Sequence, residues 1–358
     1  MKTFNIAVIE GDGIGKEVTR EGIKVLKKIE QLDGGFSLNF THFPWGCDYY
    51  LKTGKMMEED GLEKLRHFDA IYLGAVGDPK VPDSVSLRQL LLKIRVGFDQ
   101  YVNLRPVKLL AGAQTPLKNK TSKDIDFVVV RENSEGEYCG LGEWRNRDER
   151  GEYVCQTGKF TRIGTERIIR YAFELARREN RKKVTSVTKD NALNYSMVFW
   201  NKIFAEVSKD YPDIATEQLM VDACSMMFVT QPERFDVVVA SNLFGDILTD
   251  LGAAIAGGIG LAVGDNINPQ GTFPSMFESI HGSAPDIAGK NIANPIAQIW
   301  SGVDMLKHLG YKEWHDRTVQ VFETILTQKT LLTADLGGTA TTQQMGDEIC
   351  RLLEEFSR

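Results

Sequence analysis

Short apolar, β-branched runs alternate with helical patterns along almost the whole chain, and this alternation limits the possible folds more than any other feature. The runs expected to form strands are Ile6–Ile9, Ala70–Leu73, Phe127–Val130, Val184–Val187 and Val237–Ala240. Between them, "TERIIRYAFELARREN" has the period of a helix, for which Thr165 is the expected N-cap. Its apolar face consists of Ile168, Ile169, Ala172, Phe173, Leu175 and Ala176. The pattern predicts an α/β fold.

Composition excludes several classes of protein. The 358 residues carry a formal net charge of −6, which offers no basic surface to nucleic acid or to an anionic membrane. No stretch approaches the ~20 apolar residues of a membrane span, and no signal-peptide core follows the first Met. The 5 cysteines form no CxxC pair, which favours a reducing compartment. We therefore expect a cytoplasmic protein with neither nucleic acid nor membrane as a partner.

The length suggests two domains or one large α/β unit. No Pro/Ser-rich linker divides the chain, so we expect any second domain to be inserted into the first without a flexible tether. One stretch, "GLGEWRNRDERGEYVCQTGKF", is highly charged and has weak helical character. The composition of this stretch is compatible with either a solvated loop or a protruding arm.

A glycine-rich turn follows the first expected strand, in "NIAVIEGDGIGKEV". A dinucleotide-binding fingerprint requires G-x-G-x-x-G and an acid about 20 residues further on. Here the glycines are Gly11, Gly13 and Gly15, so the third comes early, and the acid near the required distance, Asp33, lies in the turn-like "QLDGGF". The spacing favours a tight strand-to-helix turn over a Rossmann fingerprint.

Three arginines stand in apolar surroundings. Arg95 and Arg105 lie ten residues apart in "LLLKIRVGFDQYVNLRPVKL", and Arg131 directly follows the strand in "DFVVVRENSEGEY". The planar guanidinium matches a carboxylate, so three together would bind a di- or tricarboxylate. Each could instead be a surface ion-pair residue, but the position of Arg131 at a strand end favours a site.

Two aspartates in "SNLFGDILTDLGAAIAGGIG", Asp246 and Asp250, share a helix face at i and i+4. They repel each other unless a cation lies between them. Together with Asp222 in "LMVDACS" they offer the oxygen ligands that Mg²⁺ or Mn²⁺ prefers. A solvated helix end is the alternative, and the apolar, glycine-rich flanks make it weaker.

Candidates for proton transfer are Lys189, just past a strand in "VTSVTKDNALNYS", and Tyr138 in "ENSEGEYCG". Lys189 would serve as a general base and Tyr138 as its acid counterpart. Most lysines are surface cations and most tyrosines are packing residues, which is the alternative for both.

Taken together, these segments resemble the metal-dependent β-decarboxylating dehydrogenases of 2-hydroxy acids, the family of isocitrate, 3-isopropylmalate, homoisocitrate and tartrate/D-malate dehydrogenases. The motifs that carry the resemblance extend over nearly the full length: "IEGDGIGKEV", "DAIYLGAVGDP", "NLRP", "VVRENSEGEY", "VTKDN", "SNLFGDILTDLGAAIAGGIG", "HGSAPDIAGKNIANPIAQI" and "GGTATTQQMGD". Several of them are long and rarely found elsewhere.

The resemblance implies an isopropylmalate-dehydrogenase-like doubly wound sheet, distinct from the Rossmann fold. Residues 1–105 and 258–358 would form a large, cofactor-binding domain, and residues 106–257 a smaller dimerising domain with an arm at about 139–162. Arg95, Arg105 and Arg131 would then bind the substrate carboxylates. Asp222, Asp246 and Asp250 would hold Mg²⁺ or Mn²⁺, and Tyr138 would protonate the enol.

The resemblance also implies a homodimer with shared active sites, because Lys189 and Asp222 would reach the site from the neighbouring subunit. NAD is expected rather than NADP, because the carboxylate of the Asp286-Ile287 pair would accept hydrogen bonds from the ribose hydroxyls and repel a 2′-phosphate. The residues expected around the cofactor are Asn191, His281, Gly282, Asp286, Ile287 and Asn294. The need for a monovalent cation stays open.

Substrate preference is expected from local departures within the family. "RENSEGEY" replaces the "RELTGG" type turn of isopropylmalate enzymes, and no acid precedes "LLLKIR". The pattern is most similar to the tartrate/D-malate members, although these usually have Trp in place of Arg88 and Arg-Glu in place of Val96-Gly97. We expect a malate-type hydroxy dicarboxylate as substrate. The alternatives are 3-isopropylmalate dehydrogenase, a non-catalytic regulatory subunit and a plain Rossmann dehydrogenase.

Overall fold

The computed structural model describes residues 1–357 and divides into two compact units. The first unit comprises Met1–Gln100, Leu109–Ser122 and Ala253–Arg358, and the second comprises Tyr101–Lys108 and Lys123–Gly252. These limits differ from the expected ones by about five residues at two boundaries and by the whole of Leu109–Ser122, which lies in the first unit. There the Ala111 amide donates a hydrogen bond to Glu323 at 3.3 Å.

The first unit is built on a sheet with the strand order β2-β1-β3-β12-β11. These strands are β1 (Lys2–Gly11), β2 (Phe36–His42), β3 (Ala70–Ala75), β11 (Val263–Ile267) and β12 (Ser275–Ser279). Strands β2, β1, β3 and β12 run parallel, and β11 runs antiparallel to β12. Strand β3 is buried along its whole length, which is typical of a parallel strand covered on both faces.

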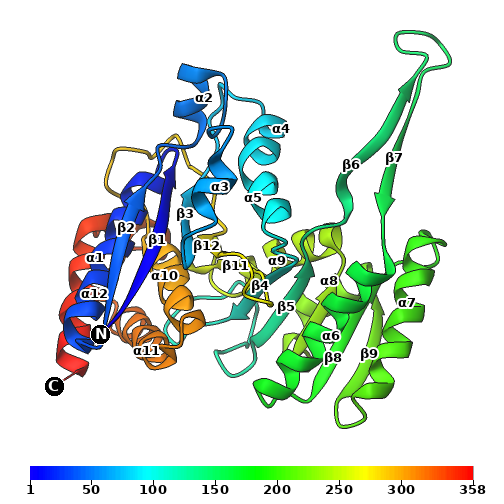
Figure 1. Cartoon of the computed structure of the whole chain (residues 1–358). Coiled ribbons are helices and arrows are strands. Elements are labelled where there is room, and N and C mark those ends of the chain that lie inside the picture. The colour runs from blue at the N-terminus through cyan, green and yellow to red at the C-terminus, as the bar shows by residue number, and fades with distance from the viewer. Residues whose placement is uncertain (358) are drawn as a thin grey trace. The chain divides into compact units, whose positions relative to one another are not determined.

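Helices cover both faces of this sheet (Figure 1). On one face Ile9 and Leu73 pack in an apolar cluster with Trp45, Leu65 and Ile94. The elements on that side are α2 (Cys47–Thr53), α3 (Gly61–Leu65), α4 (Asp83–Ser86), a π-helical turn at Leu87–Leu91 and α5 (Leu92–Gly97). The other face meets α1 (Gly15–Asp33) and α10 (Ile296–His308), with α11 (Lys312–Gln328) and α12 (Thr342–Phe356) packed behind them.

The second unit has the strand order β4-β5-β10-β8-β9. Its strands are β4 (Val102–Lys108), β5 (Asp126–Glu132), β8 (Lys183–Thr188), β9 (Ala215–Met220) and β10 (Val237–Ala240), and all but β4 run parallel. Its helices are α6 (Arg162–Arg178), α7 (Ser196–Val207), α8 (Val221–Thr230) and α9 (Asn242–Ile255). The five predicted strands and the α/β class are therefore confirmed.

The predicted helix forms as α6, and the six residues of its predicted apolar face are all buried. The predicted N-cap was wrong. Thr161 caps α6, because its hydroxyl accepts a hydrogen bond from the Gly164 amide, while Thr165 lies buried inside the helix. Glu135 accepts hydrogen bonds from both the amide and the hydroxyl of Thr161, which holds the cap in place.

The charged stretch forms an antiparallel hairpin of β6 (Gly136–Arg145) and β7 (Tyr153–Lys159) that extends away from the rest of the second unit (Figure 1). Large apolar side chains on it are exposed, among them Trp144 and Val154, which lie opposite each other in the register. No helix among residues 1–357 is both long and apolar enough to cross a membrane.

The glycine turn after β1 is a tight turn, as its spacing predicted. Gly11 and Gly13 have φ angles of 71° and 53°, where a residue with a Cβ is strained. The Ile14 amide donates a hydrogen bond to the Ser283 carbonyl at 2.8 Å, so the turn holds the loop after β12. Asp33 accepts a hydrogen bond from the Trp314 indole at 2.6 Å and thus joins α1 to α11.

Replacing Gly13 with Ala should destabilise the protein more than replacing Gly54 with Ala. Both glycines have positive φ, but a Cβ on Gly13 would lie 2.0 Å from the Ser283 carbonyl oxygen, whereas one on Gly54 would meet nothing within 4 Å. We expect Gly54→Ala to cost about 1–2 kcal/mol and Gly13→Ala roughly 1–3 kcal/mol more. Urea unfolding measures both, and equal costs would show that the Ser283 contact can relax freely.

Candidate active site

The carboxyl ends of the parallel strands of the second unit meet at one edge of its sheet, which is where α/β proteins usually place their functional side chains. Arg131 is the penultimate residue of β5, Lys189 directly follows β8, and Asp222 lies two residues after β9. Asn242, after β10, begins helix α9. The strand order thus brings residues from four distant segments to the same edge.

Asp246 on α9 lies at the centre of the side-chain cluster at this edge. One of its carboxylate oxygens accepts a very short hydrogen bond from Nη1 of Arg131, and the other accepts one from the Tyr138 hydroxyl at 2.6 Å. Nη2 of Arg105 lies 3.7 Å from the same carboxylate. The Arg131 guanidinium also lies over the Tyr138 ring, at 5.4 Å from its centroid. Four of the predicted site residues are therefore neighbours.

Asp250 follows one helical turn after Asp246, and the cation between the two is the Arg105 guanidinium, whose Nη1 lies 3.8 Å from Asp250. Burial raises the pKa of Asp250, and the nearby Asp246 carboxylate acts in the same direction against Arg105. The pair fits a divalent ion such as Mg²⁺ or Mn²⁺, because two carboxylates spaced by one turn offer hard oxygen ligands.

The third predicted metal ligand, Asp222, lies farther along the same edge, beside Lys189. Its carboxylate accepts a hydrogen bond from the Lys189 ammonium at 2.9 Å, and this hydrogen bond holds the pKa of Asp222 below its usual range. Among residues 1–357, no three His, Cys, Asp or Glu side chains form a group that could hold a metal ion. A single chain thus brings Asp246 and Asp250 together but not Asp222.

The remaining predicted arginine, Arg95, belongs to α5 in the first unit. Its Nη2 donates a hydrogen bond to Glu278 at 2.7 Å, and both side chains are buried. Asn266 donates to the same glutamate oxygen at 2.7 Å. Nε of Arg95 is buried and has no hydrogen-bond partner within residues 1–357, so one edge of the guanidinium keeps an unused donor.

The residues predicted to bind the dinucleotide in the first unit lie on the loop after β12. His281 and Asn294 are buried, Ile287 is half-buried and packs near Ile14, and Asp286 is exposed. Gly282, also exposed, accepts a hydrogen bond with its carbonyl from Nδ1 of His281 at 3.1 Å. Nε2 of His281 is buried without a partner in the described part of the chain, which leaves a polar atom for a ligand.

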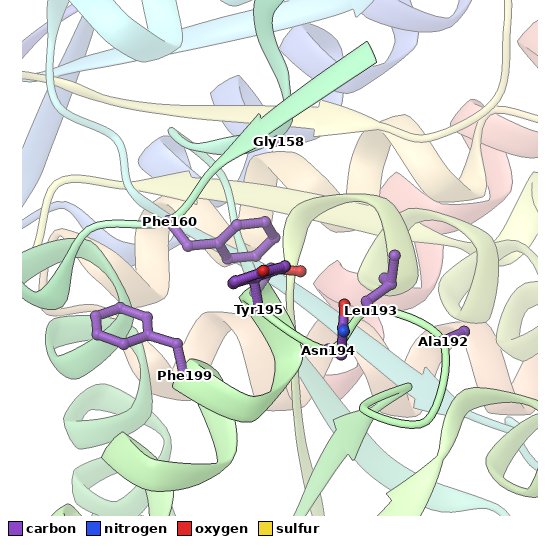
Figure 2. Close-up of a pocket in the computed structure, with 8 residues that line it drawn as sticks. Gly158, Phe160, Ala192, Leu193, Asn194, Tyr195 and Phe199 are labelled. Carbon is purple, nitrogen blue, oxygen red and sulfur yellow. The ribbon is translucent and has the colours of Figure 1, made fainter. Parts of the chain in front are cut away.

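Asn191 is exposed on the loop between β8 and α7 in the second unit. The same loop lines a pocket of about 410 Å³, together with the end of β7. Figure 2 shows Phe160 and Phe199 on one side of this pocket, Ala192, Leu193 and Asn194 on the other, and Tyr195 between them. The pocket adjoins Lys189 and Asn191 along the chain.

Sequence reasoning missed several of the side chains that bind the predicted arginines, among them one partner of each. Glu278 binds Arg95, Asn242 binds Arg131, and Thr249 binds Arg105. The spacing of Asn242 and Thr249 with Asp246 and Asp250 was a usable signal, because residues at i, i+4, i+7 and i+8 share one helix face. No comparable pattern links Glu278 to Arg95, which are distant in the chain.

The chain belongs to the isocitrate/isopropylmalate dehydrogenase family, whose model matches residues 5–349. The predicted family and the predicted enzyme class, a decarboxylating dehydrogenase acting on CH–OH groups, are thereby confirmed. Members generally use a nicotinamide dinucleotide and a divalent metal ion, act on small hydroxy acids and are dimeric.

Individual relatives match over nearly their full length. The chain is 51% identical over 357 residues to a probable tartrate dehydrogenase/decarboxylase of Bacillus subtilis, covering 99% of both chains. It is 52% identical to the D-malate dehydrogenase (decarboxylating) of Escherichia coli, again covering 99% of both. Among solved structures, the isocitrate dehydrogenase of Methylococcus capsulatus superposes with a TM-score of 0.88 at 36% identity, over 98% of this chain and 99% of that one.

Because of His281, the free energy of unfolding should decrease as the pH is lowered. Burial lowers the pKa of this imidazole, with partial opposition from its backbone hydrogen bond, so the folded chain takes up the proton only at a lower pH than the unfolded chain. Below the ordinary histidine pKa of about 6.5 the unfolded chain binds a proton that the folded chain does not, at a cost approaching roughly 1.4 kcal/mol per pH unit.

In urea unfolding between about pH 7.5 and 5.5, His281→Gln should therefore lose less stability than the unmodified protein. His67→Gln is the control, because His67 is exposed and its loss should leave the pH dependence unchanged. Identical pH dependence in all three proteins would contradict the effect of burial.

Proposed function

We propose that the protein catalyses the NAD-dependent oxidative decarboxylation of a malate-type 2-hydroxy dicarboxylic acid, with D-malate or tartrate as substrate and pyruvate and CO₂ as the products from D-malate. The observation that carries this proposal is the cluster of Arg105, Arg131, Tyr138 and Asp246, in which two buried guanidinium groups adjoin a hydroxyl and a carboxylate. Relatives about half identical over their full length support the choice of substrate.

The proposed roles follow from the chemistry of each group. Arg105 and Arg131 bind a substrate carboxylate, since their planar forks match it, and Arg95 with its unused Nε does the same. Lys189 takes the proton of the substrate hydroxyl, and the Tyr138 hydroxyl later gives a proton to the carbon from which CO₂ has left. The hydrogen bond from the Tyr138 hydroxyl to Asp246 places this hydroxyl beside a proposed metal ligand.

Two groups that the chain does not itself supply complete the chemistry. When bound, the dinucleotide would supply the hydride acceptor, and Mg²⁺ or Mn²⁺ would supply a Lewis acid for the substrate oxygens. We propose Asp222, Asp246 and Asp250 as the metal ligands. The exposed carboxylate of Asp286 favours NAD over NADP, because it can accept hydrogen bonds from ribose hydroxyls and would repel a 2′-phosphate.

We further propose that two copies of the chain share each active site, and that Lys189 and Asp222 act in the site of the neighbouring copy. In the second unit, Met226 and Val229 on α8 and Ile247 on α9 are exposed, as is Trp144 on the hairpin. Exposed apolar side chains of this kind support an interface with a second copy. The cytoplasm remains the proposed compartment on the basis of the cysteine pattern.

A substrate panel tests the proposed activity. With Mn²⁺ and NAD, reduction of NAD should be fastest with D-malate or tartrate and slower with 3-isopropylmalate and isocitrate. The value of kcat/KM should be lower with NADP than with NAD. Asp286→Ala should reduce this difference between the two cofactors, because it should raise KM for NAD. Preferred turnover of 3-isopropylmalate would make the chain an isopropylmalate dehydrogenase, and no turnover of any of them would favour the regulatory-subunit alternative.

Mixing two inactive variants tests the shared site. Lys189→Met and Asp246→Asn should each abolish turnover as homodimers while leaving NAD binding intact. If the sites are shared, heterodimers formed after subunit exchange have one intact site, and a statistical mixture should recover about a quarter of the unmodified activity. Absence of recovery in a mixture where heterodimers are demonstrated would show that Lys189 and Asp246 act within one chain.

A further inference from the structure

One face of helix α9 contacts both arginines of the second unit. Residues at i, i+3, i+4, i+7 and i+8 lie on the same side of a helix. The residues of α9 with this spacing are Asn242, Gly245, Asp246, Thr249 and Asp250. Asp246 and Asp250 are the charged members and are proposed as metal ligands above. The other three are uncharged. Asn242 and Gly245 lie against Arg131, and Thr249 accepts a hydrogen bond from Arg105.

Asn242 fixes one edge of the Arg131 guanidinium. Its side-chain oxygen accepts hydrogen bonds from Nε at 3.1 Å and from Nη2 at 2.7 Å. Its Nδ2 donates to the Glu135 carbonyl at 3.1 Å, which determines the orientation of the amide. Asn242 and Arg131 are both 2% exposed, so water does not compete for these hydrogen bonds.

Gly245 leaves room for the rest of the Arg131 side chain. A Cβ at this position would lie 2.6 Å from Cγ and 2.7 Å from Cβ of Arg131. The methylene groups therefore pack directly against the helix backbone. Asn242 and Gly245 together leave Nη1 of Arg131 as the group directed at Asp246.

Thr249 does the same for Arg105. Its hydroxyl oxygen accepts a hydrogen bond from Nη1 at 2.9 Å, and Asn103 on β4 accepts one from Nε at 2.8 Å. The Thr249 hydroxyl lies within hydrogen-bond distance of the Gly245 and Asp246 carbonyls, at 2.8 and 2.9 Å, so its own proton is directed into the helix. Thr249 is 2% exposed.

We infer that Asn242 and Thr249 are positioning residues that orient the Arg131 and Arg105 guanidinium groups for the substrate carboxylates. The inference rests on the proposed function, since it takes these arginines as substrate-binding. Both positioning groups are neutral, so they fix geometry without cancelling the positive charge. A carboxylate at either position would instead neutralise the guanidinium and weaken its attraction for an anionic substrate.

The test uses the Mn²⁺-loaded enzyme, with D-malate and NAD as the varied substrates. Thr249→Val keeps the shape of the side chain but removes the acceptor, and Thr249→Ser restores it. We expect Thr249→Val and Asn242→Leu to raise KM for D-malate by about 10-fold or more, the effect of losing a hydrogen bond to a charged group. KM for NAD should change less than about twofold, and Thr249→Ser should be close to the unmodified enzyme in both constants.

Leu248→Ala is the control for loss of stability, because Leu248 is fully buried on the same helix and contacts neither arginine through a polar group. It should lower the unfolding temperature without raising KM for D-malate. If Asn242→Leu fails to fold, the comparison of Thr249→Val with Thr249→Ser still decides the matter.

Arg105→Lys and Arg131→Lys separate the inference from the proposed function. If they leave KM unchanged for D-malate, tartrate and 3-isopropylmalate, the arginines do not bind substrate, and their proposed substrate-binding roles fail together with the inference while the activity itself stands. If they raise KM but Thr249→Val and Asn242→Leu do not, only the positioning role is overturned. A rise in KM for D-malate that Thr249→Ser does not rescue would also overturn it.

Discussion

The second unit depends on compensation of two buried positive charges by carboxylates of helix α9. Arg105 and Arg131 are 8% and 2% exposed, and a charge removed from water to this extent destabilises a protein unless it is paired and hydrogen-bonded. Asp246 pairs with both guanidinium groups, and Asp250 lies 3.8 Å from that of Arg105. Beside this ion pair, Asn242 and Gly245 of α9 lie directly against the Arg131 side chain.

The same pairing allows the arginines to exchange one carboxylate for another. Arg131 and Arg105 bind a carboxylate of the chain itself, and a substrate carboxylate is chemically the same kind of partner. A divalent ion drawn to Asp246 and Asp250 would compete with the arginines for those oxygens, and so leave the arginines to the substrate. The neutral acceptors on α9 matter here, because they hold the guanidinium groups whichever anion is present.

Most of the fold could be predicted from the sequence, because buried parallel strands appear as continuous apolar runs and amphipathic helices have a fixed period. The helix cap at Thr161 could not be predicted, because it depends on Glu135, a distant residue. Arg131, Tyr138 and Asp246, by contrast, could be chosen as site residues by their chemistry. Their contact required the order of the strands in the sheet, and the pairing of Asp222 with Lys189 was not visible in any motif.

The order in which the chain is synthesised has a consequence for the first unit. Its sheet has β12 hydrogen-bonded to β3, yet β12 comes from Ser275–Ser279, after the whole of the second unit. The second unit, nearly continuous in the chain, can therefore fold on the ribosome while the first unit waits for its last segment. Until then the edge of β3, an apolar strand, has no neighbour on that side, and an unpaired strand edge is prone to aggregate. Every nascent chain shorter than about 275 residues therefore lacks the strand that pairs with this edge of β3.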